Sequence, residues 1–293
     1  MEDRTIGYRI FTVFNTLFMI LIMFAMLYPL YYCIVASISD PVELARTPQA
    51  IFWPVGDWTL GAYDKVLHHS QILSGFRNTV FVLVVGTCVN LVLTVTCAYT
   101  LSLKNLMLKT PLALMIVFTM YFSGGLIPGY LNVKSFGMIN SLWSLIIPSA
   151  LSTYNMIIMK TAFQNIPDSL LESAHLDGAG HMTILTRIMI PLSGPTIAVM
   201  VLYYAVGHWN SWFSASIYLN DPTKYPLQLV MRNILDSASV TEMMGDVGAG
   251  DQADYVQLIK YALVVITTVP ILILYPFLQK YFVKGVMIGA VKG

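Results

Sequence analysis

Charged side chains are scarce in this 293-residue sequence, which has 16 basic and 15 acidic residues, 11% of the chain. Soluble globular domains carry about 25% charged residues, whereas 57% of this sequence is hydrophobic. The shortage excludes an ordinary soluble domain and predicts an integral membrane protein. The net charge of +1 also lacks the basic excess of a nucleic-acid-binding protein, so no nucleic-acid partner is expected.

Cysteine is rare too, and Cys33, Cys88 and Cys97 lie in apolar stretches without disulfide or metal-type spacing. We interpret them as small buried apolar residues. The five histidines are scattered without matching ligands, so no metal site is predicted. An integral-membrane enzyme is disfavoured for the same reason. The sequence lacks a glycine-rich phosphate loop ending in Gly-Lys-Ser/Thr, so any ATP must be bound by a partner.

Six intervals longer than about 18 residues, enough for a helix to cross a hydrocarbon core, contain no charged residue. A membrane barrel would instead show alternating segments of about 10 residues. We therefore predict an all-α integral membrane protein with six transmembrane helices in a single domain, residues 1–293. The predicted spans are residues 11–35, 78–103, 110–131, 139–162, 186–216 and 259–281.

The charges between the spans predict how the chain is oriented. With the N-terminus inside, one side holds nine basic and five acidic residues and the other holds seven and ten. Basic residues are retained on the cytoplasmic side, so both termini are expected there. The first span is too long for a removable signal peptide and is expected to stay as an anchor. Residues 40–76 and 221–258 become long external loops, on which a partner is expected to dock.

A cytoplasmic segment between the fourth and fifth spans predicts a short amphipathic helix over residues 167–177. Pro167 and Asp168 suit its first turn, and Asp177 followed by Gly178 supplies a stop. Two interpretations stay open on these residues alone. The helix either lies on the lipid headgroups or fits a groove on a cytoplasmic partner.

The same segment carries a family resemblance. Glu172, Ser173 and Ala174, followed by Asp177, Gly178 and Ala179 and then by Ile188 and Pro191, resemble the EAA motif of the membrane subunits of ATP-binding-cassette (ABC) importers. Ser173, Leu185 and Ile190 depart from the usual Ala, Phe and Leu. The remaining chain resembles the carbohydrate-importer branch, through Tyr28-Pro29, Asp40-Pro41, the segments 122–128 and 209–212, and the tail from Tyr275 to Gly293.

The resemblance implies a type I ABC importer permease, a transport subunit rather than an enzyme, in the bacterial cytoplasmic membrane. The implied cargo is an oligosaccharide or polysaccharide fragment, with aldouronate-type and alginate-type importers most similar; another small solute is the alternative. The implied partners are a second permease, two copies of an ABC ATPase that bind ATP and Mg²⁺, and an extracytoplasmic solute-binding protein. A passive channel, in contrast, would show no dependence on an ATPase.

By the same resemblance, the helix over residues 167–177 couples the permease to the ATPase. Glu172 would pair with an arginine of the ATPase, unless it is only a solvated surface residue. The tail residues Gly289, Lys292 and Gly293 would reach between the ATPase subunits, or would lie under anionic lipid. The last external loop, around Asp246, Gly248 and Gly250, would contact the binding protein. The expected coupling residues are Glu172, Ser173, Ala174, Asp177, Gly178, Ala179 and Pro191.

Polar and aromatic residues within the spans are candidates for a saccharide path, because polar groups in membrane helices usually face a cavity. An aromatic belt at the membrane surface is the competing interpretation for Trp209, and a hydrogen-bonded interior residue for His208. No span holds a Lys or Arg centrally, which favours a neutral sugar or one neutralised by a partner. The candidates are Tyr154, Asn155, Tyr203, Tyr204, His208, Trp209 and Asn210.

Overall fold

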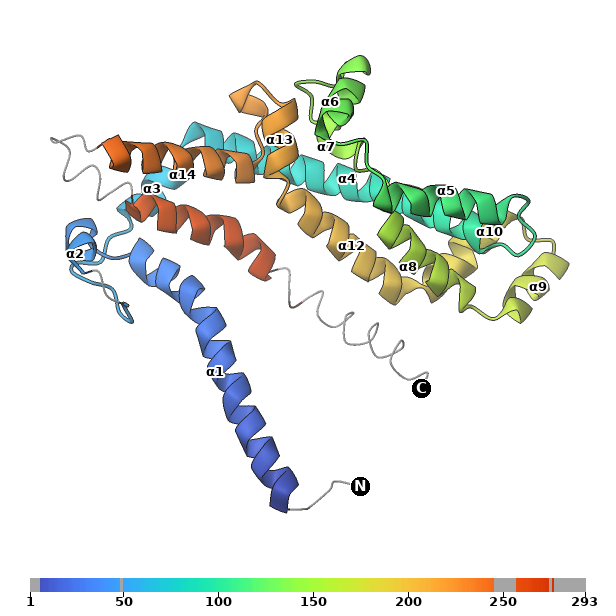
Figure 1. The fold of residues 1–293 in the computed structure, drawn as a ribbon, viewed down its shortest axis with the longest axis horizontal. Helices are drawn as coiled ribbons and strands as arrows, with labels where there is room; N and C mark the ends of the chain where they lie inside the picture. The colour runs from blue at the N-terminus through green and yellow to red at the C-terminus, as the bar shows by residue number, and fades with distance from the viewer. Residues whose placement is uncertain (1–5, 48–49, 245–256, 274–275, 277–293) are drawn as a thin grey trace. The chain divides into compact units, whose positions relative to one another are not determined.

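The computed structural model describes residues 6–47, 50–244, 257–273 and 276, and every regular element among them is helical (Figure 1). The chain divides into two compact units. The first contains the residues up to His69 together with Asn233–Val269, and the second contains Ser70–Arg232 and the residues after Val269.

The first unit is dominated by a long apolar helix, α1 (Ile6–Ser37). It also holds α2 (Pro41–Arg46), α3 (Gly61–Leu67) and an apolar helix at Gln257–Ile273. Asp40 caps α2, because its carboxylate accepts hydrogen bonds from the backbone N–H groups of Val42 and Glu43. The 18-residue apolar window of α1 is 0% buried within the described part of the chain, so its cover must come from lipid or a partner.

The second unit is built on α4 (Ser70–Ser102), a 33-residue apolar helix. It packs along its length against α8 (Thr153–Gln164) and α12 (Gly194–Trp209), and these three helices lie side by side in Figure 1. The other elements of the unit are α5 (Lys109–Tyr121), α6 (Leu126–Ser135), α7 (Trp143–Ile146), α9 (Asp168–Leu176), α10 (His181–Ile184), the π-helix η1 (Leu185–Met189), α11 (Ile190–Leu192), α13 (Trp212–Tyr218), the 3₁₀ helix η2 (Pro222–Lys224) and the start of α14 (Leu227–Met244).

Several predicted spans are bent. The helix at residues 110–131 is split into α5 and α6, which meet at 116°, and Gly125 at the junction has a φ of +86° that favours glycine. The segments His181–Leu192 and Gly194–Trp209 meet at 84°. Two described helices, α1 and α4, are long and apolar enough to cross a membrane, or up to four if each bent pair forms one span. The number of spans and the side of the termini therefore stay predictions.

Two further intervals differ from the elements that the sequence predicted. Residues 139–162 form α7 and α8 with an irregular stretch between them. Ile147 keeps helical backbone angles (φ −67°, ψ −44°), but Pro148 after it has no backbone N–H to continue the helical hydrogen bonds. Residues 221–258, expected as a loop, contain the 18-residue helix α14. Its residues Leu227, Val230 and Ile234 recur at helical spacing, which gives this segment an apolar stripe.

Candidate functional site

Helix α9 begins and ends at residues that suit those positions. Asp168 occupies its first turn, where a negative charge is favoured by the helix dipole. At its other end Ala179 donates to the carbonyl of Ala174 at 2.9 Å and Gly178 donates to that of His175 at 3.0 Å. This pair of hydrogen bonds is a Schellman motif, and Gly178 has the left-handed φ of +78° that the motif requires. The chain therefore leaves α9 in a fixed direction.

One face of α9 is fastened to the helices of the second unit. Ala174 is buried in a core cluster that includes Tyr99 of α4, Phe163 of α8 and Ile184 of α10. Leu171 and Ala179 pack against the same cluster. Because packed cores are stiff, a displacement of α9 must be shared with α4 and α8.

An ion pair holds the start of α9. The ammonium of Lys104, in the connection between α4 and α5, lies 2.5 Å from the carboxylate of Asp168. The hydrogen bond to Asp168 and its negative charge, with a smaller contribution from Glu172, raise the pKa of Lys104. Both partners are solvent-exposed, so the pair orients α9 more than it stabilises the fold.

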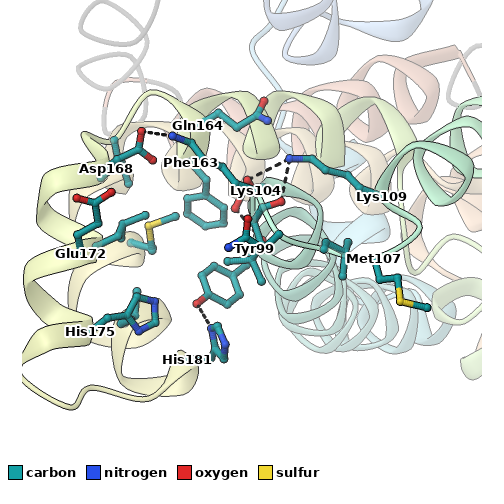
Figure 2. Close-up of a pocket in the computed structure, with 18 residues that line it drawn as sticks. Tyr99, Lys104, Met107, Lys109, Phe163, Gln164, Asp168, Glu172, His175 and His181 are labelled. Atoms are coloured by element: carbon teal, nitrogen blue, oxygen red, sulfur yellow. Dashed lines mark hydrogen bonds and ion pairs between the residues drawn. The ribbon is translucent and has the colours of Figure 1, made fainter.

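A cavity of about 560 Å³ lies between α9 and the end of α4 (Figure 2). Asp168, Glu172 and His175 point toward it from one face of α9. On the facing side, Lys109 donates to the carbonyl oxygens of Ser102 and Leu103, which closes the C-terminus of α4. Tyr99 and His181 share a hydrogen bond of 2.9 Å at the edge of the cavity.

The other motif residues are distributed around α9. Ser173 is exposed and donates to the carbonyl of Ser169 within the helix, and Asp177 is the exposed C-terminal cap. Pro191 is exposed in α11, beyond the π-helix, and lies outside the cavity lining. The structure thus brings Glu172, Ala174, Gly178 and Ala179 together as one unit.

A second polar site lies where the predicted span 139–162 is broken. Asn90 of α4 donates from its amide to the carbonyl oxygens of Ser149 at 2.7 Å and Ala150 at 2.9 Å. Its amide oxygen lies 2.7 Å from Nε2 of His208, so the imidazole donates through that nitrogen. In a membrane interior, backbone groups released by a helix break need such partners. We call this set the Asn90 network.

Tyr204 of α12 completes the support of the break. Its hydroxyl accepts a hydrogen bond of 3.2 Å from the backbone N–H of Ser152 and shares one of 2.7 Å with the buried Thr94. Gly86 makes room for His208, because a Cβ there would lie 2.5 Å from Nε2 of the ring. Both α4 and α12 therefore hold the break by neutral hydrogen bonds.

A second cavity, of about 430 Å³, opens beside the break. Among the predicted pathway residues, Asn155, Tyr203, Tyr204 and His208 line it. Trp209 is instead buried with its ring edge-on to Phe76. Tyr154 and Asn210 are exposed and lie outside this lining.

The remaining predicted site residues lie outside the described part of the chain. They are the loop residues Asp246, Gly248 and Gly250 and the tail residues Gly289, Lys292 and Gly293.

Sequence reasoning missed Lys104, Asn90 and Gly86. Asn90 had a visible signal, since it is a polar residue at the centre of the charge-free span 78–103. Pro148 was a second visible signal, because a proline lacks the N–H that the interior of a helix needs. Lys104 offered none, because its partner is 64 residues away in the sequence.

Residues 72–288 match the family described as binding-protein-dependent transport system inner membrane component. The chain belongs to this family. The permease is 42% identical over 276 residues, 93% of its length and 96% of the relative's, to the polygalacturonan/rhamnogalacturonan transport system permease protein YtcP of Bacillus subtilis. It is also 42% identical over 285 residues to Protein LplC of the same organism, covering 97% of the permease and 96% of LplC.

A solved structure extends these matches to the fold. The permease superposes with a TM-score of 0.87 and 30% identity on a chain of a bacterial ABC transporter involved in the import of the acidic polysaccharide alginate. The match covers 96% of the permease and 100% of that chain. The permease therefore has the type I ABC permease fold and is a transport subunit, not an enzyme, which confirms the family predicted from the EAA-like residues.

Proposed function

We propose that this permease forms half of the pathway by which an ABC importer takes up oligosaccharides or polysaccharide fragments across the bacterial cytoplasmic membrane. A second permease supplies the other half, and a solute-binding protein delivers the saccharide. Two copies of an ABC ATPase bind ATP and Mg²⁺ and drive the cycle. The named substrates of two relatives, polygalacturonan and alginate, support a saccharide cargo.

The geometry of α9 carries this proposal. Its Glu172 lines the cavity at the end of α4, while Ala174 on another face is buried in the core shared with α4 and α8. A cationic side chain of the ATPase entering this cavity would pair with Glu172. Movement of the ATPase would then displace α9, and the shared core would pass that displacement to the membrane helices.

The substrates named for two relatives, polygalacturonan and alginate, carry carboxylates. Cationic side chains must meet these carboxylates, and this permease has none in the middle of its predicted spans. No predicted span holds a Lys or Arg at its centre. The permease then contacts mainly the hydroxyl face of the saccharide, and cations of the second permease or the binding protein meet the carboxylates.

The substitution Glu172→Ala tests the coupling role. In proteoliposomes with the complete importer, uptake of a saccharide should fall at least tenfold, because a charge pair at an interface costs roughly 2–5 kcal/mol when one partner is removed. Thermal unfolding of the permease should change little, because Glu172 is exposed.

Thr110→Ala is the control, since Thr110 is an exposed polar residue of α5 that lies outside α9 and outside the lining of the cavity. It should leave uptake unchanged. Normal ATP-driven uptake by Glu172→Ala would refute the coupling role. If the unmodified importer took up another small solute and no saccharide, the cargo would be reassigned.

A further inference from the structure

The cavity beside the helix break has the size and chemistry of a small-molecule site. Its volume of about 430 Å³ falls within the range of about 300–1,000 Å³ typical of ligand pockets. The described residues that line it supply hydroxyl, amide, imidazole and aromatic groups and include no Asp, Glu, Lys or Arg. Such a lining suits a ligand rich in hydroxyl groups and disfavours a buried carboxylate.

Most polar groups around this cavity already have structural partners. Ser149 donates from its hydroxyl to the carbonyl of Leu145, and Ser211 to that of His208. The hydroxyl of Ser152 caps α8, and that of Tyr204 holds the break. These groups shape the wall, so they are less free to recognise a ligand.

Asn155 is the exception. It is 6% exposed, it lines the cavity, and its side-chain amide makes no hydrogen bond within the described part of the chain. Among the described residues, the only side-chain polar atom that is fully buried without a partner is Oγ1 of Thr87, so the amide atoms of Asn155 are accessible from the cavity and open to a ligand that enters it. Ser214 of α13 lines the same cavity and is exposed, which offers a second hydroxyl.

We infer that this cavity binds one sugar unit of the translocated saccharide and that Asn155 determines its specificity. An amide both donates and accepts hydrogen bonds, so it matches a pair of neighbouring sugar hydroxyls. Any carboxylate of the sugar points away from this wall, where no described lining residue is charged. The inference rests on the proposed function, and it assigns the contact between Asn155 and the sugar to this subunit.

Protection of an introduced cysteine measures occupancy directly. The permease is first freed of Cys33, Cys88 and Cys97 and then given Ser214→Cys, in a complete importer whose ATPase is hydrolysis-deficient. The rate of modification by a small neutral thiosulfonate is recorded with and without the galacturonic acid tetrasaccharide and the binding protein. We expect the tetrasaccharide to slow modification at least fivefold.

Ser216→Cys is the matched control, because Ser216 lies on the same helix, is exposed and is outside the cavity lining. Its modification should not respond to the saccharide. Unprotected modification of Ser214→Cys, or equal protection of both cysteines, would overturn the inference. This readout does not depend on transport.

The substitution Asn155→Leu tests the assigned residue while keeping its size. Leucine cannot form the proposed hydrogen bonds to the sugar, so the tetrasaccharide concentration that gives half-maximal uptake should rise about tenfold. Stimulation of ATP hydrolysis by the loaded binding protein should persist, because Asn155 does not line the cavity between α9 and the end of α4. Wild-type uptake kinetics would contradict the role of Asn155. Absence of saccharide uptake by the unmodified importer would instead reject the proposed function.

Discussion

The exposed charged residues Lys104, Asp168 and Glu172, which we call the α9 surface, and the buried Asn90 network both hold a segment in place, but with opposite chemistry. At α9, the exposed ion pair of Lys104 and Asp168 and the charge of Glu172 set the orientation of a helix. At the helix break, neutral hydrogen bonds from the buried Asn90 and His208 hold the backbone. Charged groups hold the exposed helix, where water can replace a lost ion-pair partner. Neutral groups hold the buried break, where water cannot replace a lost hydrogen-bond partner.

The difference has a functional meaning. An exposed ion pair is worth little and exchanges readily, so under the proposed coupling role the α9 surface is suited to rearrange when an ATPase binds. A buried network is costly to disrupt, because each orphaned group loses its partner without gaining water. The break is therefore the fixed part of the second unit, and the α9 surface is the part suited to change partners.

The largest loss of stability is expected from Asn90→Leu. It leaves the carbonyls of Ser149 and Ala150 and the imidazole of His208 unpaired, which should lower the free energy of unfolding by about 3 kcal/mol. Thermal unfolding of the purified permease complex measures this loss. Asn132→Leu, on an exposed position of α6, should have little effect. Equal stability of the two variants would show that the Asn90 network does not stabilise the fold more than an exposed residue does.

A somewhat smaller loss is expected from Gly86→Ala. The added Cβ would lie 2.5 Å from Nε2 of His208, and overpacking of this kind costs about 1–3 kcal/mol. The same unfolding measurement applies, with Gly129→Ala as a control because the nearest atom there is 4.0 Å away. His208→Ala is itself destabilising because it leaves the amide oxygen of Asn90 without its partner, but it also removes the clash, so the double variant should lose less than the sum of the two single losses. A loss equal to that sum would indicate another cause.

Gly178→Ala should act on α9 alone. Its φ of +78° is a left-handed conformation that costs a side-chain-bearing residue about 1 kcal/mol. We expect faster hydrogen exchange in α9 and weaker ATPase binding, with α4 and α8 unchanged. Gly180→Ala is a matched control, since Gly180 has a φ of −75° and open space around it. Identical exchange in both variants would show that the turn does not require glycine.

The smallest effect is expected from Lys104→Ala, with a melting temperature lowered by less than about 2 °C. The raised pKa of Lys104 means that its ion pair contributes below pH 10.5 and is lost as the pH rises through the higher folded value. The difference between wild type and Lys104→Ala should therefore vanish at strongly alkaline pH. Exchanging the charges with Lys104→Asp and Asp168→Lys should rebuild the ion pair but puts a positive charge in the first turn of α9, so it should restore the orientation of α9 only in part. A loss as large as that of Asn90→Leu would contradict the assignment of this pair to a minor role.

Helix α9 could be predicted from the sequence, whereas the Asn90 network could not. The bounds of α9 followed from local signals, because Pro167, Asp168 and Gly178 act within one helix. The all-helical character followed from the absence of charge, and the family from the EAA-like residues. The Asn90 network could not be derived, because its hydrogen bonds join residues 59, 60 and 118 positions apart. Local patterns predict elements, whereas these contacts depend on how α4, α8 and α12 pack.

The π-helix η1 connects the two regions, since Leu185–Met189 lies between α9 and α12 in the chain. A π-helical turn holds more residues than an α-helical one, and π-turns within helices often occur at functional sites. A π turn fits one extra residue into a helical turn, so deleting a single residue here would restore α-helical winding and leave the flanking segments in nearly the same angular register. Deleting a residue from an α-helical stretch would instead rotate one side against the other by about 100°, so the π-helix is where the connection from α9 to α12 can lose a residue with the least change of register.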